Sequence, residues 1–401
     1  MTIGEFASFN IGILVYFAGV RLNGKITFLN RYNIPEPVSG GLFVAGIVLL
    51  VYLVSGSEIG FSLETRDFLL LYFFTSIGLN ARFADLLKGG RPLALLLGLT
   101  IAFMILQNIV GVVAGVSMGL PVAFGLIGGT VSLVGGHGTA IAWAPTFAET
   151  YGVASAAEIG AATATLGLIL ASIMGGPTAK YLIEGRGAKP APEVHEKVAN
   201  IGFERDGDQV QQITHVDLMR SLLVLNIAIV LGVALQKAIG EAGLELPLFV
   251  VCLFCGILLS NIVPMLFPRL AWPARTPGLA VISEFALGVF LAISLMSLQL
   301  WTIAGLAGPM LIILGLQVLA AGSFILFVLF PVMGRDYEAA VLGAGFAGFA
   351  LGATPTAIAN MTAVTKHYGP ATKAFLILPL VSAFFVDLAN AAIIRVFLNL
   401  S

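Results

Sequence analysis

Residues 132–142 read Ser-Leu-Val-Gly-Gly-His-Gly-Thr-Ala-Ile-Ala, and residues 352–360 read Gly-Ala-Thr-Pro-Thr-Ala-Ile-Ala-Asn. Both stretches contain Thr-Ala-Ile-Ala, at positions 139–142 and 356–359, so the shared residues lie 217 positions apart. The same shift places Tyr151-Gly152 on Tyr368-Gly369 and Pro92 on Pro309 without a gap. A four-residue identity at one constant offset, within matched hydropathy, indicates an internal repeat that aligns residues 66–183 with residues 283–400.

The chain around these stretches is far more apolar than a soluble protein. Of its 401 residues, 58% are hydrophobic and 10% are charged, with a mean hydropathy of +1.01, whereas soluble domains carry about 25% charged residues. Uncharged runs long enough for membrane-spanning helices occur at residues 92–120, 159–179 and 246–268, and the uncharged run 285–334 is long enough for two. We therefore expect an all-α polytopic membrane protein. The net charge of −1, without a basic tract, gives no sign of nucleic-acid binding.

One sustained polar stretch, residues 184–215, interrupts this pattern. We interpret it as a cytoplasmic linker between two membrane repeats, residues 1–183 and residues 216–401. Repeated halves are characteristic of secondary transporters, which bind their substrates at the interface of the repeats.

Two apolar stretches, at about residues 121–147 and 339–364, are rich in glycine and proline. Such density interrupts a regular helix, so each stretch either spans the membrane irregularly or forms a re-entrant hairpin. If both are re-entrant, ten spans remain. They cover residues 2–20, 37–54, 67–86, 92–116, 158–183, 216–237, 246–267, 278–296, 303–330 and 374–397.

The positive-inside rule favours the ten-span arrangement. With ten spans, 17 lysines and arginines fall on one side and only Arg66, Lys237 and Arg395 on the other. With both stretches spanning, the division becomes 9 against 11. The linker is then cytoplasmic and both termini are periplasmic. Because each repeat has five spans, the second is inverted, and the two hairpins approach the membrane midplane from opposite sides.

Polar groups at the hairpins and on the last predicted span suit an anion and a hard cation. Glycine lets main-chain N–H groups approach an anion closely, and hydroxyl and carbonyl oxygens suit sodium. A carboxylate inside a span marks an ion or substrate site, and we expect Asp387 to be the one acidic residue well inside a span. The candidate substrate ligands are Ser132, Gly135, Gly136, His137, Gly138, Thr139, Thr354, Thr356, Asn360 and Asp387. The candidate sodium site lies near Gly352, Ala353, Asp387 and Asn390.

Several motifs resemble those of the bacterial sodium/glutamate symporters, over essentially the whole chain. They are Ile34-Pro35-Glu36-Pro37, Ser76-Ile77-Gly78-Leu79-Asn80, Gly135-Gly136-His137-Gly138-Thr139, the stretch at residues 352–360, and the segment around Asp387. The resemblance implies inverted five-helix domains with re-entrant loops and sodium-coupled uptake of L-glutamate across the bacterial inner membrane. It also implies an elevator mechanism in a lipid-embedded homodimer, with sodium as co-substrate and no other cofactor.

Three other transport functions stay open at this point, and an enzyme is not expected. A carrier of 2-hydroxy acids such as citrate or malate has a similar architecture. Its substrates, however, have no ammonium group that could donate a hydrogen bond to Asp387. A proton-coupled carrier would use His137, and a channel would need a continuous polar lining. The chain has no Gly-x-x-x-x-Gly-Lys loop, so ATP-driven transport is not indicated.

Overall fold

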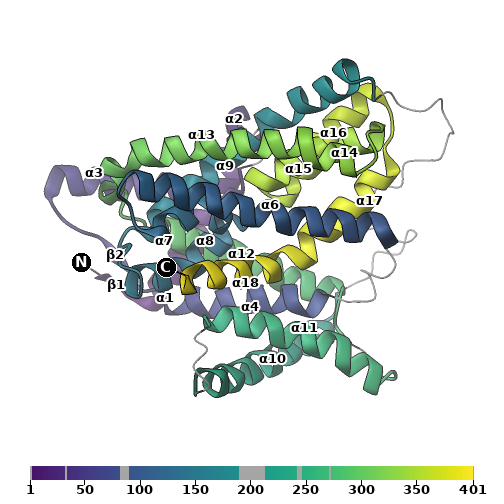
Figure 1. Ribbon diagram of the computed structural model, residues 1–401. Helices are drawn as coiled ribbons and strands as arrows, with labels where there is room; N and C mark the ends of the chain where they lie inside the picture. The colour runs from purple at the N-terminus through teal and green to yellow at the C-terminus, as the bar shows by residue number, and fades with distance from the viewer. Residues whose placement is uncertain are drawn as a thin grey trace. The chain divides into compact units, whose positions relative to one another are not determined.

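The computed structural model describes residues 2–31, 34–81, 90–188, 213–241, 246–270 and 272–400, and almost all of its regular structure is helical (Figure 1). Two compact units divide the chain. Unit 1 comprises Met1–Phe83, Ile141–Ala148 and Gln211–Gly305, and unit 2 comprises Ala84–Ala140, Glu149–Val210 and Leu306–Ser401. Each unit therefore takes segments from both predicted repeats. The repeat boundaries at residues 183 and 216 remain a prediction, and most of the predicted linker lies outside the described residues.

Unit 1 is a bundle of long helices with one short pair of parallel strands. Its elements are β1 (Thr2–Ile3), α1 (Glu5–Lys25), α2 (Thr27–Arg31), α3 (Glu36–Ser55), β2 (Gly60–Phe61), α4 (Glu64–Asn80), α10 (His215–Glu241), α11 (Leu248–Leu266) and α12 (Pro277–Met296). The 3-10 helix η3 (Leu300–Leu306) follows α12. Glycines allow α1 and α3 to approach closely, because a Cβ on Gly40 would lie 2.0 Å from the carbonyl oxygen of Val15. In membranes, where hydrophobic burial does not drive helices together, small residues at helix interfaces allow the close van der Waals packing that stabilises helix association.

Unit 2 contains both glycine-rich stretches. Its elements are α6 (Gly90–Ser117), α7 (Val122–Leu126), η1 (Ile127–Val131), α9 (Ala156–Lys180), η2 (Tyr181–Gly185), α13 (Ala307–Phe324), η4 (Ile325–Leu329), α14 (Phe330–Val332), α15 (Tyr337–Leu351), α16 (Thr354–Tyr368), α17 (Thr372–Leu380), η5 (Val381–Phe385) and α18 (Val386–Asn399). α8 (Gly136–Glu149) begins in unit 2 and continues into unit 1. The rings of Phe103, Phe324 and Phe346 pack at centroid distances of 5.2, 5.3 and 5.8 Å, joining α6, α13 and α15 in one core.

Helix ends follow local sequence. Thr276 caps α12 by accepting a hydrogen bond from the Leu279 amide, with Pro277 in the first turn. Asp336 caps α15 by accepting from the Ala339 amide at 2.8 Å. These caps fix where α12 and α15 begin.

Among the described residues, eight helices are long and apolar enough to cross a membrane, which supports a polytopic membrane protein. They are Glu5–Lys25, Glu36–Ser55, Gly90–Ser117, Ala156–Gly185, His215–Glu241, Leu248–Leu266, Pro277–Met296 and Ala307–Val332, and each coincides with a predicted span. The other two predicted spans are also helical but shorter or interrupted. α4 has 17 residues, and residues 82–86 of that predicted span lie outside the described residues; η5 separates α17 from α18. The number ten and the inversion of the repeats stay predictions.

Both glycine-rich stretches consist of two helical segments joined by a break. In the first, α7 and η1 precede residues 132–135, which are not helical, and α8 follows. In the second, α15 and α16 are separated by residues 352–353. We call residues 132–135 the first break and residues 352–353 the second break. The interruption of both stretches was predicted from their glycines; the return of each stretch to its own side of a membrane stays a prediction.

Candidate functional site

The first break is formed by glycine backbone geometry. Gly129 inside η1 has φ −107° and ψ −132°, which no helix accommodates, and Gly136 has φ +65°, in the left-handed region that favours glycine. The Gly135 amide donates to the Thr130 carbonyl at 2.8 Å and thereby closes the turn. A Cβ on Gly135 would lie 2.6 Å from Cβ of Thr139, so the turn folds back tightly on the first turn of α8. Gly138 lies in that same turn.

The second break is extended. Ala353 has φ −160° and ψ 164°, and its amide donates to the Gly348 carbonyl at 3.1 Å. α16 then begins with Thr354-Pro355, and proline is favoured in a first helical turn. At each break a helix thus begins, and the first amides of a helix have no partner within it.

The structure brings the two breaks together. A Cβ built on Gly136 would have as its nearest neighbour the carbonyl oxygen of Gly352, at 3.9 Å. α9 contacts both stretches as well: a Cβ on Gly167 would lie 2.3 Å from the Leu351 carbonyl and 2.7 Å from the Leu133 side chain. The two glycine motifs therefore lie side by side within unit 2, and their position at the membrane midplane stays a prediction.

His137 lies at the start of α8 and is almost fully buried. Its Nε2 lies 2.9 Å from Oγ1 of Thr165, and the Thr165 hydroxyl donates to the Ala161 carbonyl at 2.8 Å. A hydroxyl has one hydrogen to donate, so Thr165 accepts from His137, and we infer that the imidazole carries its proton on Nε2. Its Nδ1 has no partner among the described residues.

Asn360 is held inside unit 2 by two helices. Its Nδ2 donates to the Ala171 carbonyl of α9 at 3.0 Å and to the Ala344 carbonyl of α15 at 3.3 Å. Gly175 leaves the space for it, because a Cβ there would lie 2.3 Å from the same nitrogen. Asn360 thus fixes α16 against α9 and α15.

Asn390 bonds to the first glycine-rich stretch rather than the second. Its Nδ2 donates to the Thr130 carbonyl at 3.1 Å, and Thr130 in turn donates through its amide and hydroxyl to Oδ1 of Asn108. Asp387 lies one turn before Asn390 on α18 and is partly buried. Its carboxylate makes no hydrogen bond or ion pair with any residue that the structure describes.

Several buried polar atoms of unit 2 have no hydrogen-bond partner within the described part of the chain. Among the candidate residues these are Oγ of Ser132, Oγ1 of Thr356 and Oδ1 of Asn390. Native proteins satisfy most buried polar groups, and exceptions need an explanation such as a bound molecule. Their location beside the breaks is the strongest sign of a ligand site. Thr139 is also buried, and Thr354 is half-buried.

Sequence reasoning missed three features. Gln317 is a fully buried amide of α13 that bonds to η1. The residues of α9 that pack on the breaks were detectable as small residues two turns apart on one helix face, Gly160, Gly167 and Gly175. The expectation that Asp387 is the one acidic residue inside a span is wrong, because Glu284 lies within α12 and is exposed.

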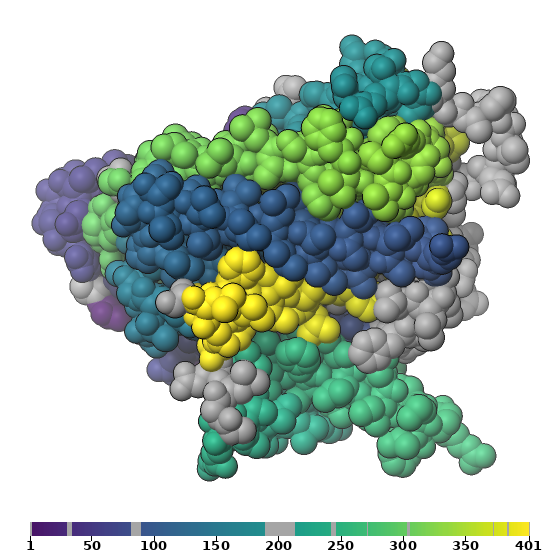
Figure 2. Space-filling view, viewed as in Figure 1, coloured from purple at the N-terminus to yellow at the C-terminus, as the bar shows by residue number. Residues whose placement is uncertain are grey.

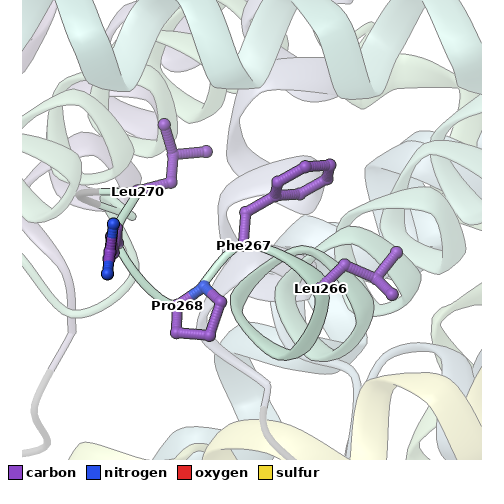
Figure 3. A pocket seen from close by; sticks show the side chains of 5 residues that line it. Leu266, Phe267, Pro268 and Leu270 are labelled. Atoms are coloured by element: carbon purple, nitrogen blue, oxygen red, sulfur yellow. The ribbon is translucent and has the colours of Figure 1, made fainter.

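A hollow at the end of α11 has a volume of about 690 Å³, and its described lining residues do not bring several polar side chains together. Figure 3 shows the side chains of Leu266, Phe267, Pro268 and Leu270 around one bend of the chain. All of its lining residues are consecutive, with Arg269 as the one charged group. It is a surface feature of unit 1, and the chemistry favours the breaks in unit 2 as the candidate site.

Comparison with known proteins identifies the family. The family model described as "Sodium/glutamate symporter" matches residues 1–370. The chain belongs to the sodium/glutamate symporter family. It is 41% identical over 397 residues to the sodium/glutamate symporter of Haemophilus influenzae, covering 98% of this chain and 97% of that protein. It is 40% identical over 388 residues to the sodium/glutamate symporter of Escherichia coli, covering 96% and 95%.

Membership in the sodium/glutamate symporter family agrees with the resemblance seen in the motifs. Symporters are transporters rather than enzymes, and the apolar helices make this member a multi-pass membrane protein.

Proposed function

We propose that this chain takes up L-glutamate together with sodium across the bacterial inner membrane, and that both bind in unit 2 at the two breaks. The observation that carries the proposal is the meeting of the two breaks, with Gly136 beside the Gly352 carbonyl, among buried polar atoms that lack partners. Family membership supports the pairing of glutamate with sodium.

The substrate's charges fit the polar groups at the breaks. Glutamate carries two carboxylates and one ammonium. Helix N-termini bind carboxylates through unpaired amides and the helix dipole, and both α8 and α16 begin at a break. In this proposal the carboxylates are bound by the backbone of residues 135–139 and by the hydroxyls of Ser132, Thr139, Thr354 and Thr356. The direct contact with a carboxylate that was expected of Asn360 is not proposed, because its amide hydrogens are donated to Ala171 and Ala344 and it holds α16 in place.

The ammonium group and the sodium ion need oxygen ligands. Asp387 supplies a carboxylate without a partner among the described residues, and Oδ1 of Asn390 is a buried acceptor left over after its amide bonds to Thr130. We place sodium near these two side chains and the backbone of Gly352 and Ala353. The unprotonated Nδ1 of His137 is a second acceptor for an ammonium group.

The mechanism that we propose is an elevator, in which unit 2 carries the bound solutes and unit 1 stays fixed within a homodimer embedded in lipid. The ten spans, the inverted repeats with re-entrant hairpins, the periplasmic termini and the cytoplasmic linker belong to this proposal. A single cysteine at Asn200, in a chain lacking Cys252 and Cys255, should react only with reagents added from the cytoplasmic side. Reaction from the periplasm would refute this topology.

Counterflow in proteoliposomes tests the transported solutes. Labelled glutamate should accumulate with sodium and not with choline, because an anion in a low-dielectric site needs compensating cations. Unlabelled glutamate should compete and citrate should not. Sodium-independent uptake driven by a proton gradient would refute the coupling, and uptake of citrate in preference to glutamate would favour the 2-hydroxy acid carrier.

A further inference from the structure

A pair of buried glutamines connects the two glycine-rich stretches. Gln107 is on α6 and Gln317 is on α13, and both are fully buried. Nε2 of Gln317 donates to the Gly128 carbonyl of η1 at 3.2 Å and to the backbone carbonyl of Gln107 at 2.8 Å. Nε2 of Gln107 donates to the Ala350 carbonyl of α15 at 2.9 Å. The Gln317 side chain, the Gln107 backbone and the Gln107 side chain therefore link η1 to α15 through three hydrogen bonds.

Both ends of this path lie next to a break. Gly128 immediately precedes Gly129, the residue with non-helical backbone angles inside η1. Ala350 is two residues from Gly352, in the last turn of α15, where helix carbonyls lack a partner within the helix. The glutamines thus bind the carbonyls whose positions determine how each break is oriented.

The helices that carry the two glutamines pack against each other and against η1. α6 packs on both α13 and η1, and Figure 2 shows α6 lying between α13 and α18 on one face of unit 2. Gly111 lets α6 approach α7 closely, because a Cβ there would lie 2.2 Å from the Gly125 carbonyl oxygen, and the same Cβ would lie 3.3 Å from Nε2 of Gln317. A shift of Gly128 must therefore move Gln317 or break its hydrogen bonds.

The side-chain amides of Gln107 and Gln317 have a defined orientation. Because all three acceptors are carbonyls, both glutamines must present Nε2 to them. Their Oε1 atoms are left buried without a partner among the described residues. An unpaired buried acceptor costs stability, so two apolar side chains would be the simpler way to pack these helices. The contribution that these two amides make in this structure is donation to backbone carbonyls, two of which lie next to the breaks.

We propose that Gln107 and Gln317 are positioning residues that transmit the occupancy of one break to the other, and so couple sodium binding to glutamate binding. The inference rests on the proposed function, in which glutamate is bound by groups of both breaks and sodium lies near Gly352, Ala353, Asp387 and Asn390. If a ligand at the first break shifts η1, the path through Gln317 and Gln107 shifts the end of α15, and the reverse also holds because coupling between sites is reciprocal.

The test is the dependence of the glutamate KM on sodium in proteoliposomes. The coupling factor is the KM at low sodium divided by the KM at saturating sodium, and coupling between sites is typically about 5- to 150-fold. Gln317→Met and Gln107→Met keep the side-chain volume and remove the donors. Each should reduce the coupling factor to below about threefold while uptake at saturating sodium continues, and the double variant should be no worse than either single one, because residues in one network are not additive.

Thr100→Val is the matched control. Thr100 is on α6, fully buried and two turns from Gln107, but its hydroxyl donates to the Leu96 carbonyl of its own helix. It should keep the wild-type coupling factor. A coupling factor within twofold of wild type in both glutamine variants, or an equal loss in Thr100→Val, would overturn the positioning role.

The same measurements distinguish a failure of the proposed sodium coupling from a failure of the positioning role. If the wild-type glutamate KM is itself independent of sodium, then sodium coupling is wrong and the positioning role is wrong with it. If the wild type shows coupling and the glutamine variants retain it, only the positioning role is wrong.

Discussion

Gly136→Ala should impair transport by straining the first break, and not by filling space. The Cβ of the new alanine would lie 3.9 Å from the Gly352 carbonyl oxygen, which is ordinary van der Waals contact. The φ of +65° at this position is the left-handed region, where a side chain costs roughly 1–2 kcal/mol. If the strain is relieved by a shift of residues 135–139, the site populates its binding geometry roughly 5- to 30-fold less.

Gly152→Ala supplies the matched control, because Gly152 also belongs to unit 2 and has φ +71° with open space around its Cβ position. Both variants should lower the melting temperature in detergent by a similar amount, since the backbone strain is the same. Only Gly136→Ala should raise the glutamate KM in proteoliposomes, by about the factor that the strain gives.

A third variant separates backbone strain from access to the backbone. Asparagine tolerates left-handed angles, so Gly136→Asn should recover the melting temperature but not the KM, because its side chain occupies the space at the Gly352 carbonyl. Equal loss of transport in Gly136→Ala and Gly152→Ala would refute the argument. Wild-type kinetics in Gly136→Asn would show that only the backbone angle matters.

Other substitutions test single contacts of the candidate site. Asp387→Asn should raise the apparent affinity constant for glutamate or for sodium roughly 100- to 1000-fold, since removing one partner of a buried charge pair costs about 3–5 kcal/mol. If both affinity constants are unchanged in protein that reaches the membrane, the carboxylate has a structural role. Gly175→Ala should lower glutamate uptake, because the new Cβ would lie 2.3 Å from the amide nitrogen of Asn360 and displace it. Gly176→Ala is the control and should leave uptake intact, because the space around its Cβ position is open. Equal uptake in the two variants would contradict the role of Asn360. Thr165→Val removes the hydroxyl that accepts from Nε2 of His137. The loss of about 1 kcal/mol of hydrogen bonding should raise the glutamate KM about fivefold. An unchanged KM would show that the imidazole ring only fills space.

The sequence predicted the interruption of both glycine-rich stretches, because glycine density is a local property that acts on the local backbone. Non-helical residues do occur at 132–135 and 352–353, and Gly136 has the left-handed angles that only glycine adopts readily. Of the ten spans predicted from local composition, eight coincide with described helices that are long and apolar enough to cross a membrane.

Partners across long sequence distances could not be predicted in the same way. Asn390 was expected beside the second stretch, yet it bonds to Thr130, which is 260 residues away. The path from Gln317 to Gly128 joins residues 189 positions apart, and a single amide on an apolar helix gives no sign of which backbone it will meet. Glu284 was detectable from its position within a predicted span, because it directly precedes the uncharged run 285–334.

The division of each unit between distant parts of the chain has a consequence for biosynthesis. η1 and the first break enter the membrane early, but their hydrogen-bonding partners Gln317 and Asn390 are made last. Until α13 and α18 are inserted, the Gly128 and Thr130 carbonyls lack these donors in an apolar surrounding. The nascent chain therefore passes through a stage in which two carbonyls of the candidate site lack donors that they have in the complete fold. Insertion machinery that shelters α6 and η1 until the C-terminal helices arrive would protect the chain during this interval.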